Sequence, residues 1–105
     1  MSESPAGYWI ISALVTDPQS FGGYTGAAGP VIAGYGGRAI VTGAEFDVVE
    51  GEAAGRPYII EFASLETARN CNFSEGYQAA IALRSGSANF RVVIAEGAPK
   101  SQGDK

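Results

Sequence analysis

The sequence predicts an α+β fold whose elements follow one another in the order β-α-β-β-α-β. Runs rich in β-branched and aromatic residues mark four strands, at residues 7–15, 38–43, 58–63 and 88–97. Apolar residues at helical spacing fill the intervals before and after the central pair of strands. A glycine-containing turn joins that pair into a hairpin. This order is the ferredoxin-like one, a four-stranded antiparallel sheet with its helices on one face.

The first strand, residues 7–15, is largely apolar on both faces. One face carries Tyr8, Ile10, Ser12 and Leu14, and the other carries Trp9, Ile11, Ala13 and Val15. A strand with this pattern has to be covered on both sides. The helices can cover only one face of the sheet, so a second layer has to cover the other.

The first helix begins with Asp17 as its N-cap and Pro18 at the first helical position. Its apolar face consists of Phe21, Tyr24, Ala28, Val31, Ile32 and Tyr35. Each of its interior glycines costs about 1 kcal/mol relative to alanine, and Pro30 costs about 3 kcal/mol. We therefore expect a helix that is kinked or interrupted near Pro30, stabilised by packing, and ended by Gly36 and Gly37.

In the central hairpin, we expect the strand at 38–43 to continue as "EFDVVEG" after a bulge around Gly43 and Ala44. Two serines then predict helix starts in the second helical interval. Ser64 is an N-cap with Thr67 at the third helical position, and Ser74 is a second N-cap. Gly86 is expected to end the helix.

The charge and the residue types exclude several classes of function. The chain has 105 residues, a net charge of −4 and no run of Lys or Arg, so it lacks the basic stripe that nucleic acid requires. There is no histidine, which removes the commonest metal ligand and the usual base of a nucleophile pair. The single cysteine, Cys71, can form neither an internal disulfide nor a cysteine cluster. We expect no metal and no cofactor.

Residues 7–97 are predicted to form one domain, with flexible ends at 1–6 and 98–105. The first residues lack the basic region and the apolar stretch of a signal peptide. No apolar run approaches the ~20 residues of a membrane span. These observations predict a cytoplasmic protein with no membrane partner.

Strand alternation further predicts a homodimer. Depending on register, the face opposite the helices carries a row such as Trp9, Ile11, Ala13, Val41, Ile59 and Val93. Such a row exceeds the few hundred Å² of apolar patch that a soluble monomer usually exposes. Two sheets packed face to face around a two-fold axis bury it and form a dimeric α+β barrel.

Six stretches carry a resemblance to a known family: "GYWI…VTDP", "YGGR", "VVEG", "IIEFAS", "CNFSEGYQAA" and "ALRSGSA". From about Gly7 to Gly97 the chain resembles the short bacterial proteins known as domain of unknown function 1330, in the dimeric α+β-barrel superfamily. The resemblance implies a ferredoxin-like protomer and a dimer, and it brings no established activity. The first helix is richer in glycine than is typical of that family, and Phe73 stands where a Tyr or Trp is common.

The candidate ligand-binding residues are Tyr24, Tyr35, Arg38, Glu61, Tyr77 and Arg84. Arg38 and Glu61 lie on neighbouring strands, where they either form an ion pair that fixes register or dimer geometry, or hold a ligand carboxylate and accept a proton. The three tyrosines are either core and interface residues or the polar lining of a pocket between helix and sheet. Arg84 either binds a ligand or satisfies the last carbonyls of its helix.

These features favour a dimeric module that binds a small molecule of unknown identity. The alternative is a cofactor-independent enzyme, of the oxygenase, isomerase or lyase type, acting on a small and mostly apolar substrate in the barrel pocket. The alternative rests on analogy of fold, and the sequence leaves open whether any reaction is catalysed.

Overall fold

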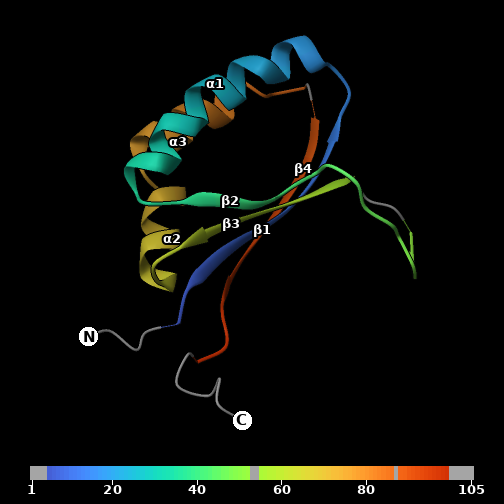
Figure 1. The fold of residues 1–105 in the computed structure, drawn as a ribbon. Coiled ribbons are helices and arrows are strands. Elements are labelled where there is room, and N and C mark those ends of the chain that lie inside the picture. The colour runs from blue at the N-terminus through green and yellow to red at the C-terminus, as the bar shows by residue number, and fades with distance from the viewer. Residues whose placement is uncertain (1–4, 53–54, 87, 100–105) are drawn as a thin grey trace.

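The helices and strands follow one another in the predicted order in the computed structural model, which describes residues 5–52, 55–86 and 88–99 (Figure 1). They are β1 (Gly7–Val15), α1 (Pro18–Gly34), β2 (Arg38–Thr42), β3 (Arg56–Phe62), α2 (Leu65–Asn72), α3 (Glu75–Ala82) and β4 (Ala88–Glu96). Residues 1–4 and 100–105, which belong to the predicted flexible ends, lie outside the described part of the chain.

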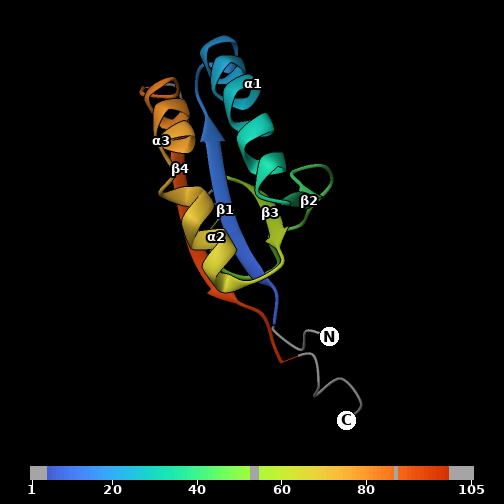
Figure 2. The same cartoon turned by 90° about the vertical axis from the view of Figure 1, so that its left-hand side faces the viewer.

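The four strands form one antiparallel sheet in the order β2-β3-β1-β4. The helices of the described chain all lie on one face of this sheet, with α1 beside α3 (Figures 1 and 2). The predicted ferredoxin-like α+β fold is therefore confirmed. Neither view shows a helix or strand of the described residues over the opposite face of the sheet, which we call the uncovered face.

The strand register corrects the prediction of which residues lie on the uncovered face. Trp9 pairs with Ile60 and Ile94, and its side chain is completely buried under the helices. Ile11 and Ala13, on the same side of β1, are buried with it. The predicted row thus mixed two faces, because alternation along one strand cannot say which face meets the helices.

Helix α1 starts as predicted, because the Asp17 carboxylate accepts a hydrogen bond of 3.3 Å from the Ser20 N–H and Pro18 follows the cap. The expected interruption near Pro30 is wrong, since the helix continues through this exposed proline to Gly34. Tyr35 is the C-cap, and Gly36 follows it with a φ of +78°, a conformation that glycine adopts without steric cost.

Both predicted serine caps are present, and they divide the second helical interval into two helices. The hydroxyl of Ser64 accepts from the Thr67 N–H at 3.1 Å, and that of Ser74 accepts from the Tyr77 N–H at 3.2 Å. Helix α3 ends at Ala82 and does not reach Gly86. The N–H groups of Leu83 and Arg84 bond three residues back, which tightens the last turn and ends the helix early.

The central hairpin is shorter than predicted. Strand β2 ends at Thr42, and its irregularity lies between Ala39 and Val41 instead of at Gly43 and Ala44. Gly43 has a φ of +73°, which turns the chain away from β3. Residues 44–52 consequently form no strand, and they extend away from the sheet as a segment that we call the arm (Figure 1).

Candidate functional site

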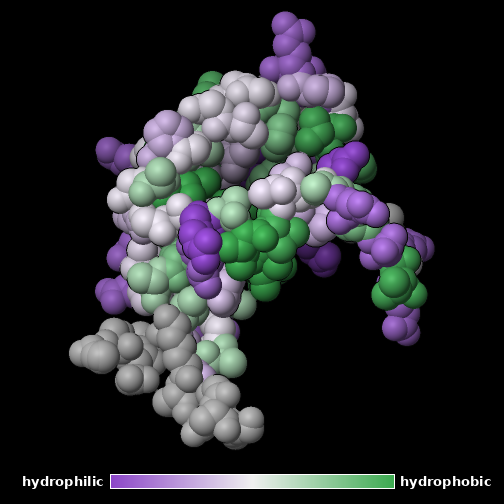
Figure 3. Space-filling model, viewed as in Figure 1, coloured by the Kyte–Doolittle hydropathy of each residue, from purple (hydrophilic) through white to green (hydrophobic). Residues whose placement is uncertain are grey.

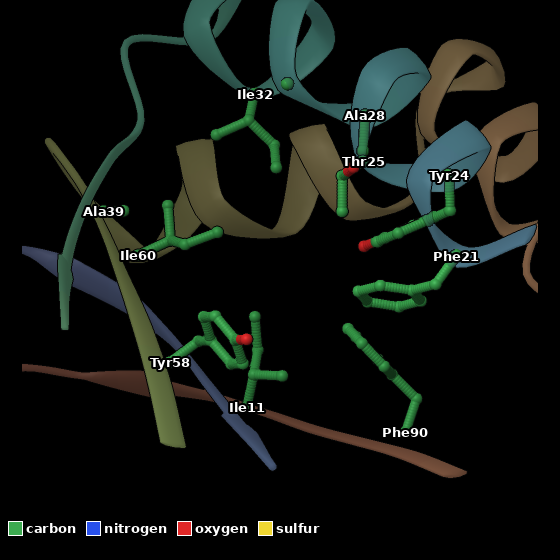
Figure 4. Close-up of a pocket in the computed structure, with 11 residues that line it drawn as sticks. Ile11, Phe21, Tyr24, Thr25, Ala28, Ile32, Ala39, Tyr58, Ile60 and Phe90 are labelled. Carbon is green, nitrogen blue, oxygen red and sulfur yellow. The ribbon is translucent and has the colours of Figure 1, made fainter. Parts of the chain in front are cut away.

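A pocket of about 220 Å³ lies between α1 and the sheet (Figure 4). It is lined by Ile11, Phe21, Tyr24, Thr25, Ala28, Gly29, Ile32, Ala39, Tyr58, Ile60 and Phe90. Helix α1 forms one side of the pocket, and residues from all four strands form the other.

Three aromatic rings form one wall of the pocket. Phe21 and Tyr24 come from successive turns of α1, and Phe90 comes from the start of β4. The centroid of the Phe21 ring lies 5.3 Å from that of Tyr24 and 5.9 Å from that of Phe90, while Tyr24 and Phe90 are 5.5 Å apart. Such tilted contacts stabilise the wall beyond the burial of its area.

Small residues leave the space in front of this wall empty. Helix α1 presents Thr25, Ala28 and Gly29 to the pocket, and β2 presents Ala39. A Cβ atom added at Gly29 would have no neighbour within 4 Å. Gly29, one of the glycines that weaken α1, therefore also leaves out a side chain that could have filled part of the gap between helix and sheet.

The pocket is nearly free of polar groups. None of the described residues that line it is charged, and its side-chain polar atoms are the hydroxyls of Tyr24, Thr25 and Tyr58. Thr25 donates to the Gly22 carbonyl at 3.0 Å, and Tyr24 shares a hydrogen bond with the hydroxyl of Tyr77. The pKa of Tyr24 lies far above its ordinary value, because the side chain is buried and, as a smaller effect, because of that hydrogen bond. Tyr24 therefore remains a neutral phenol at neutral pH, and its phenolate is not available as a base.

Three of the predicted site residues meet at the aromatic wall, where Tyr77 and Arg84 lie against Tyr24. The guanidinium carbon of Arg84 lies 4.8 Å from the centre of the Tyr24 ring and 4.0 Å from that of Phe90. Its Nη1 atom lies 3.5 Å from the Tyr77 hydroxyl. Of these three residues only Tyr24 lines the pocket, so Arg84 acts on the pocket through the rings it contacts.

Arg38 and Glu61 lie elsewhere, on the uncovered face. They are cross-strand partners, and their side chains form an ion pair of 3.2 Å in which Arg38 is 74 % exposed. The Tyr8 hydroxyl donates to Glu61 at 3.1 Å, and this bond raises the pKa of Tyr8. The sixth candidate, Tyr35, is the exposed C-cap of α1. Among the described residues, it belongs neither to the group of Tyr24, Tyr77 and Arg84 nor to that of Arg38 and Glu61.

The sequence did not single out most of the pocket residues. Phe21 and Ile32 belong to the predicted apolar face of the first helix, and Tyr58 and Phe90 lie in predicted strands, but none of them is a predicted site residue. The feature of the sequence that could have indicated the pocket is a set of large apolar residues on strands that face a helix rich in glycine. Among the described residues, no group of three or more His, Cys, Asp or Glu side chains is placed to hold a metal ion.

The fold recurs in proteins of distant sequence. A protein of unknown function from Rhodopseudomonas palustris, RPA0582, superimposes with a TM-score of 0.73 at 14% identity, over 90% of this chain and 84% of that one. SnoaB from Streptomyces nogalater, a cofactor-independent oxygenase, gives a TM-score of 0.61 at 11% identity, over 88% of this chain and 92% of that one. A dimeric protein of unknown function and ferredoxin-like fold from Bacteroides fragilis gives a TM-score of 0.57 at 13% identity, over 87% of this chain and 95% of that one.

The sequence matches no curated protein. In the described part of the chain, no helix has both the length and the apolar character needed to cross a membrane. The sequence profile of one family, described as domain of unknown function DUF1330, matches residues 6–98. The chain therefore belongs to the DUF1330 family.

Proposed function

We propose that the protein is a homodimeric binding module that holds a small, neutral, mostly apolar molecule between α1 and the sheet. The observation that supports this proposal is the pocket of about 220 Å³ with aromatic and aliphatic walls. An apolar cavity of about 150 Å³ is already large enough to accept benzene. One or two fused rings are therefore the size of ligand that fits.

The lining also favours a neutral ligand over a charged one. A charged group would leave water without gaining an opposite charge among the described lining residues. An apolar ligand instead gains about 25 cal/mol for each Å² of apolar surface that it removes from water. The hydroxyls of Tyr58 and Thr25 provide lone pairs for at most a few hydrogen bonds.

The test is a titration with indole, a neutral bicyclic probe, followed by amide chemical shifts. We expect saturable shifts at residues that line the pocket. Gly29→Leu fills the pocket and should abolish these shifts, whereas Gly26→Leu, at an α1 glycine outside the lining with equal open space, should retain them. Equal binding by both variants, or shifts confined to other surfaces, would refute the proposed site.

A cofactor-independent enzyme is the second candidate, favoured by the Tyr24 hydroxyl on the pocket wall with the Arg84 guanidinium behind its ring. SnoaB, with the same fold, is such an oxygenase. If the protein is such an enzyme, the wild type should convert a bound aromatic compound into a product during incubation, and Tyr24→Phe should bind the compound without converting it. Unchanged probe after prolonged incubation with the wild type leaves binding as the function.

The proposed dimer forms through the uncovered face. Val41, Ile59, Ile10 and Val93 are paired in register and make one apolar row across all four strands. Ile10 is 44% exposed and Val93 is 49% exposed in the single chain, so the row faces water unless a second layer covers it. The Bacteroides fragilis protein of this fold is itself dimeric.

Sedimentation and native mass spectrometry test the dimer, whose mass is twice the 10.8 kDa of the chain. Ile10→Arg places a charge at the centre of the row and should give a monomer. Phe73→Arg, at an exposed residue of the helical layer, should remain dimeric. A monomeric wild type at micromolar concentration would rule out this assembly.

A further inference from the structure

The arm, residues 44–52, carries apolar and acidic side chains together. Its apolar residues are exposed, and Val49 is 90% exposed. Glu45, Asp47, Glu50 and Glu52 give it four carboxylates and no basic residue. In Figure 3 hydrophobic side chains lie along the arm among hydrophilic ones. Neighbouring valines that face water in a charged segment point to an interaction surface.

The local structure holds the base of the arm in place. The Gly43 carbonyl accepts a hydrogen bond of 2.9 Å from the Arg56 guanidinium, whose carbon lies 5.8 Å from the centre of the Phe46 ring. Gly43 has a φ of +73°, and a Cβ there would lie 2.7 Å from the ring of Tyr58, so the backbone and the nearby ring both favour glycine where the arm leaves β2. The base is thus anchored, while Val48 and Val49 extend beyond it.

The arm runs toward the side of the sheet that lacks helices. In Figure 1 it leaves the ends of β2 and β3 and descends on the side opposite α1. The register places Arg38 and Arg91 on the uncovered face, at positions on the two edge strands. Glu61 lies on the same face as the ion-pair partner of Arg38. The acidic arm and this face are therefore complementary in charge, and both contain apolar side chains.

We propose that the arm clasps a second copy of the chain, packing Val48 and Val49 against that copy's uncovered face. The arm's carboxylates lie near Arg38 and Arg91 of the second copy. A two-fold axis makes the contact reciprocal, so each arm holds the other chain. This inference rests on the proposed dimer through the uncovered face and assigns the arm as its second contact.

The first test is the dimer dissociation constant, measured by sedimentation. The double variant Val48→Ser/Val49→Ser should weaken the dimer about tenfold or more, because two buried valines are lost from each arm. The control Phe73→Ser/Leu83→Ser changes two exposed apolar residues of the helical layer and should leave the constant unchanged. Equal constants for both double variants would overturn the clasp.

The second test locates the arm directly. Val49→Cys protein without ¹⁵N carries a spin label on its new cysteine and is mixed with ¹⁵N-labelled wild type. Only the wild-type chain gives amide signals, so any broadening of them comes from a label on the other chain. Cys71 is buried and should resist labelling. The clasp predicts broadening in β1 and β4 at residues that face away from the helices. A stable mixed dimer without this broadening would refute the clasp and leave the dimer, whereas a monomeric wild type would refute both.

Discussion

Beneath α2 and α3 the core is filled by large side chains, whereas beneath α1 it surrounds a pocket of about 220 Å³. We call these regions the packed half and the pocket half. The packed half consists of Trp9, Phe62, Ala68, Cys71 and Tyr77, each at most 1% exposed. The Trp9 ring lies 5.1 Å from that of Phe62 and 4.8 Å from that of Tyr77, between centroids.

The two halves share the same strands and differ in the helices above them. In the packed half, Ala68 lets α2 come close enough for its carbonyl to accept a hydrogen bond of 2.9 Å from the Trp9 indole. In the pocket half, α1 packs along α3, and its small residues face strands that also offer Ala39. Small residues thus bring one helix close to the sheet and leave space under the other.

The largest expected difference between the halves comes from removing a phenylalanine. Phe62→Ala should lower the free energy of unfolding by about 3–5 kcal/mol, because the ring is enclosed on all sides. Phe21→Ala, on the pocket wall, should cost less than about 2 kcal/mol, since this ring already borders open space. Urea denaturation of both variants checks the comparison, and equal losses would contradict it.

A second prediction uses the buried thiol of the packed half. Burial raises the pKa of Cys71 to about 11 from an ordinary value of 9.0. The unfolded chain therefore releases this proton first, so the contribution to stability is complete below pH 9 and is lost as the pH rises toward 11. We expect the free energy of unfolding to fall by about 1–3 kcal/mol over that window.

Denaturation curves at pH 8 and pH 10.5 measure this loss. Cys71→Ala should lose less stability than the wild type over the same interval, because it has no thiol to ionise. Tyrosines also ionise there, but they do so in both proteins and cancel in the difference. Identical pH dependence in the two proteins would contradict the role of burial.

The smallest expected effect concerns α1 itself. Gly22→Ala should raise the free energy of unfolding by about 0.5–1 kcal/mol, because the position is exposed, a Cβ there has no neighbour within 4 Å, and alanine favours the helix. Gly36→Ala, with equal space but a φ of +78°, should lower it. Thermal denaturation distinguishes the two signs, and a gain from both substitutions would contradict the assigned helix end.

The features predicted correctly from the sequence are those set by neighbouring residues. Asp17, Ser64 and Ser74 cap helices through bonds to residues three positions on, which a sequence pattern can reveal. The face that Trp9 occupies and the position of the irregularity in β2 depend on partners far along the chain. The pocket depends on the separation of α1 from the sheet, which no local pattern fixes. For this reason the sequence indicates only Tyr24 among the residues that line the pocket, and it gives no sign that Phe90 and Tyr58 line it too.

One substitution made in each half tests the contrast most directly, with unfolding free energies measured in urea. Ala39→Leu places its added carbons in the pocket, and we expect it to change stability by less than about 1 kcal/mol or to stabilise the protein. Ala68→Leu overfills a site with no exposed surface and should cost about 1–3 kcal/mol or more. Equal costs at the two positions would mean that no usable space lies beneath α1, and would contradict both the contrast and the binding site built on it.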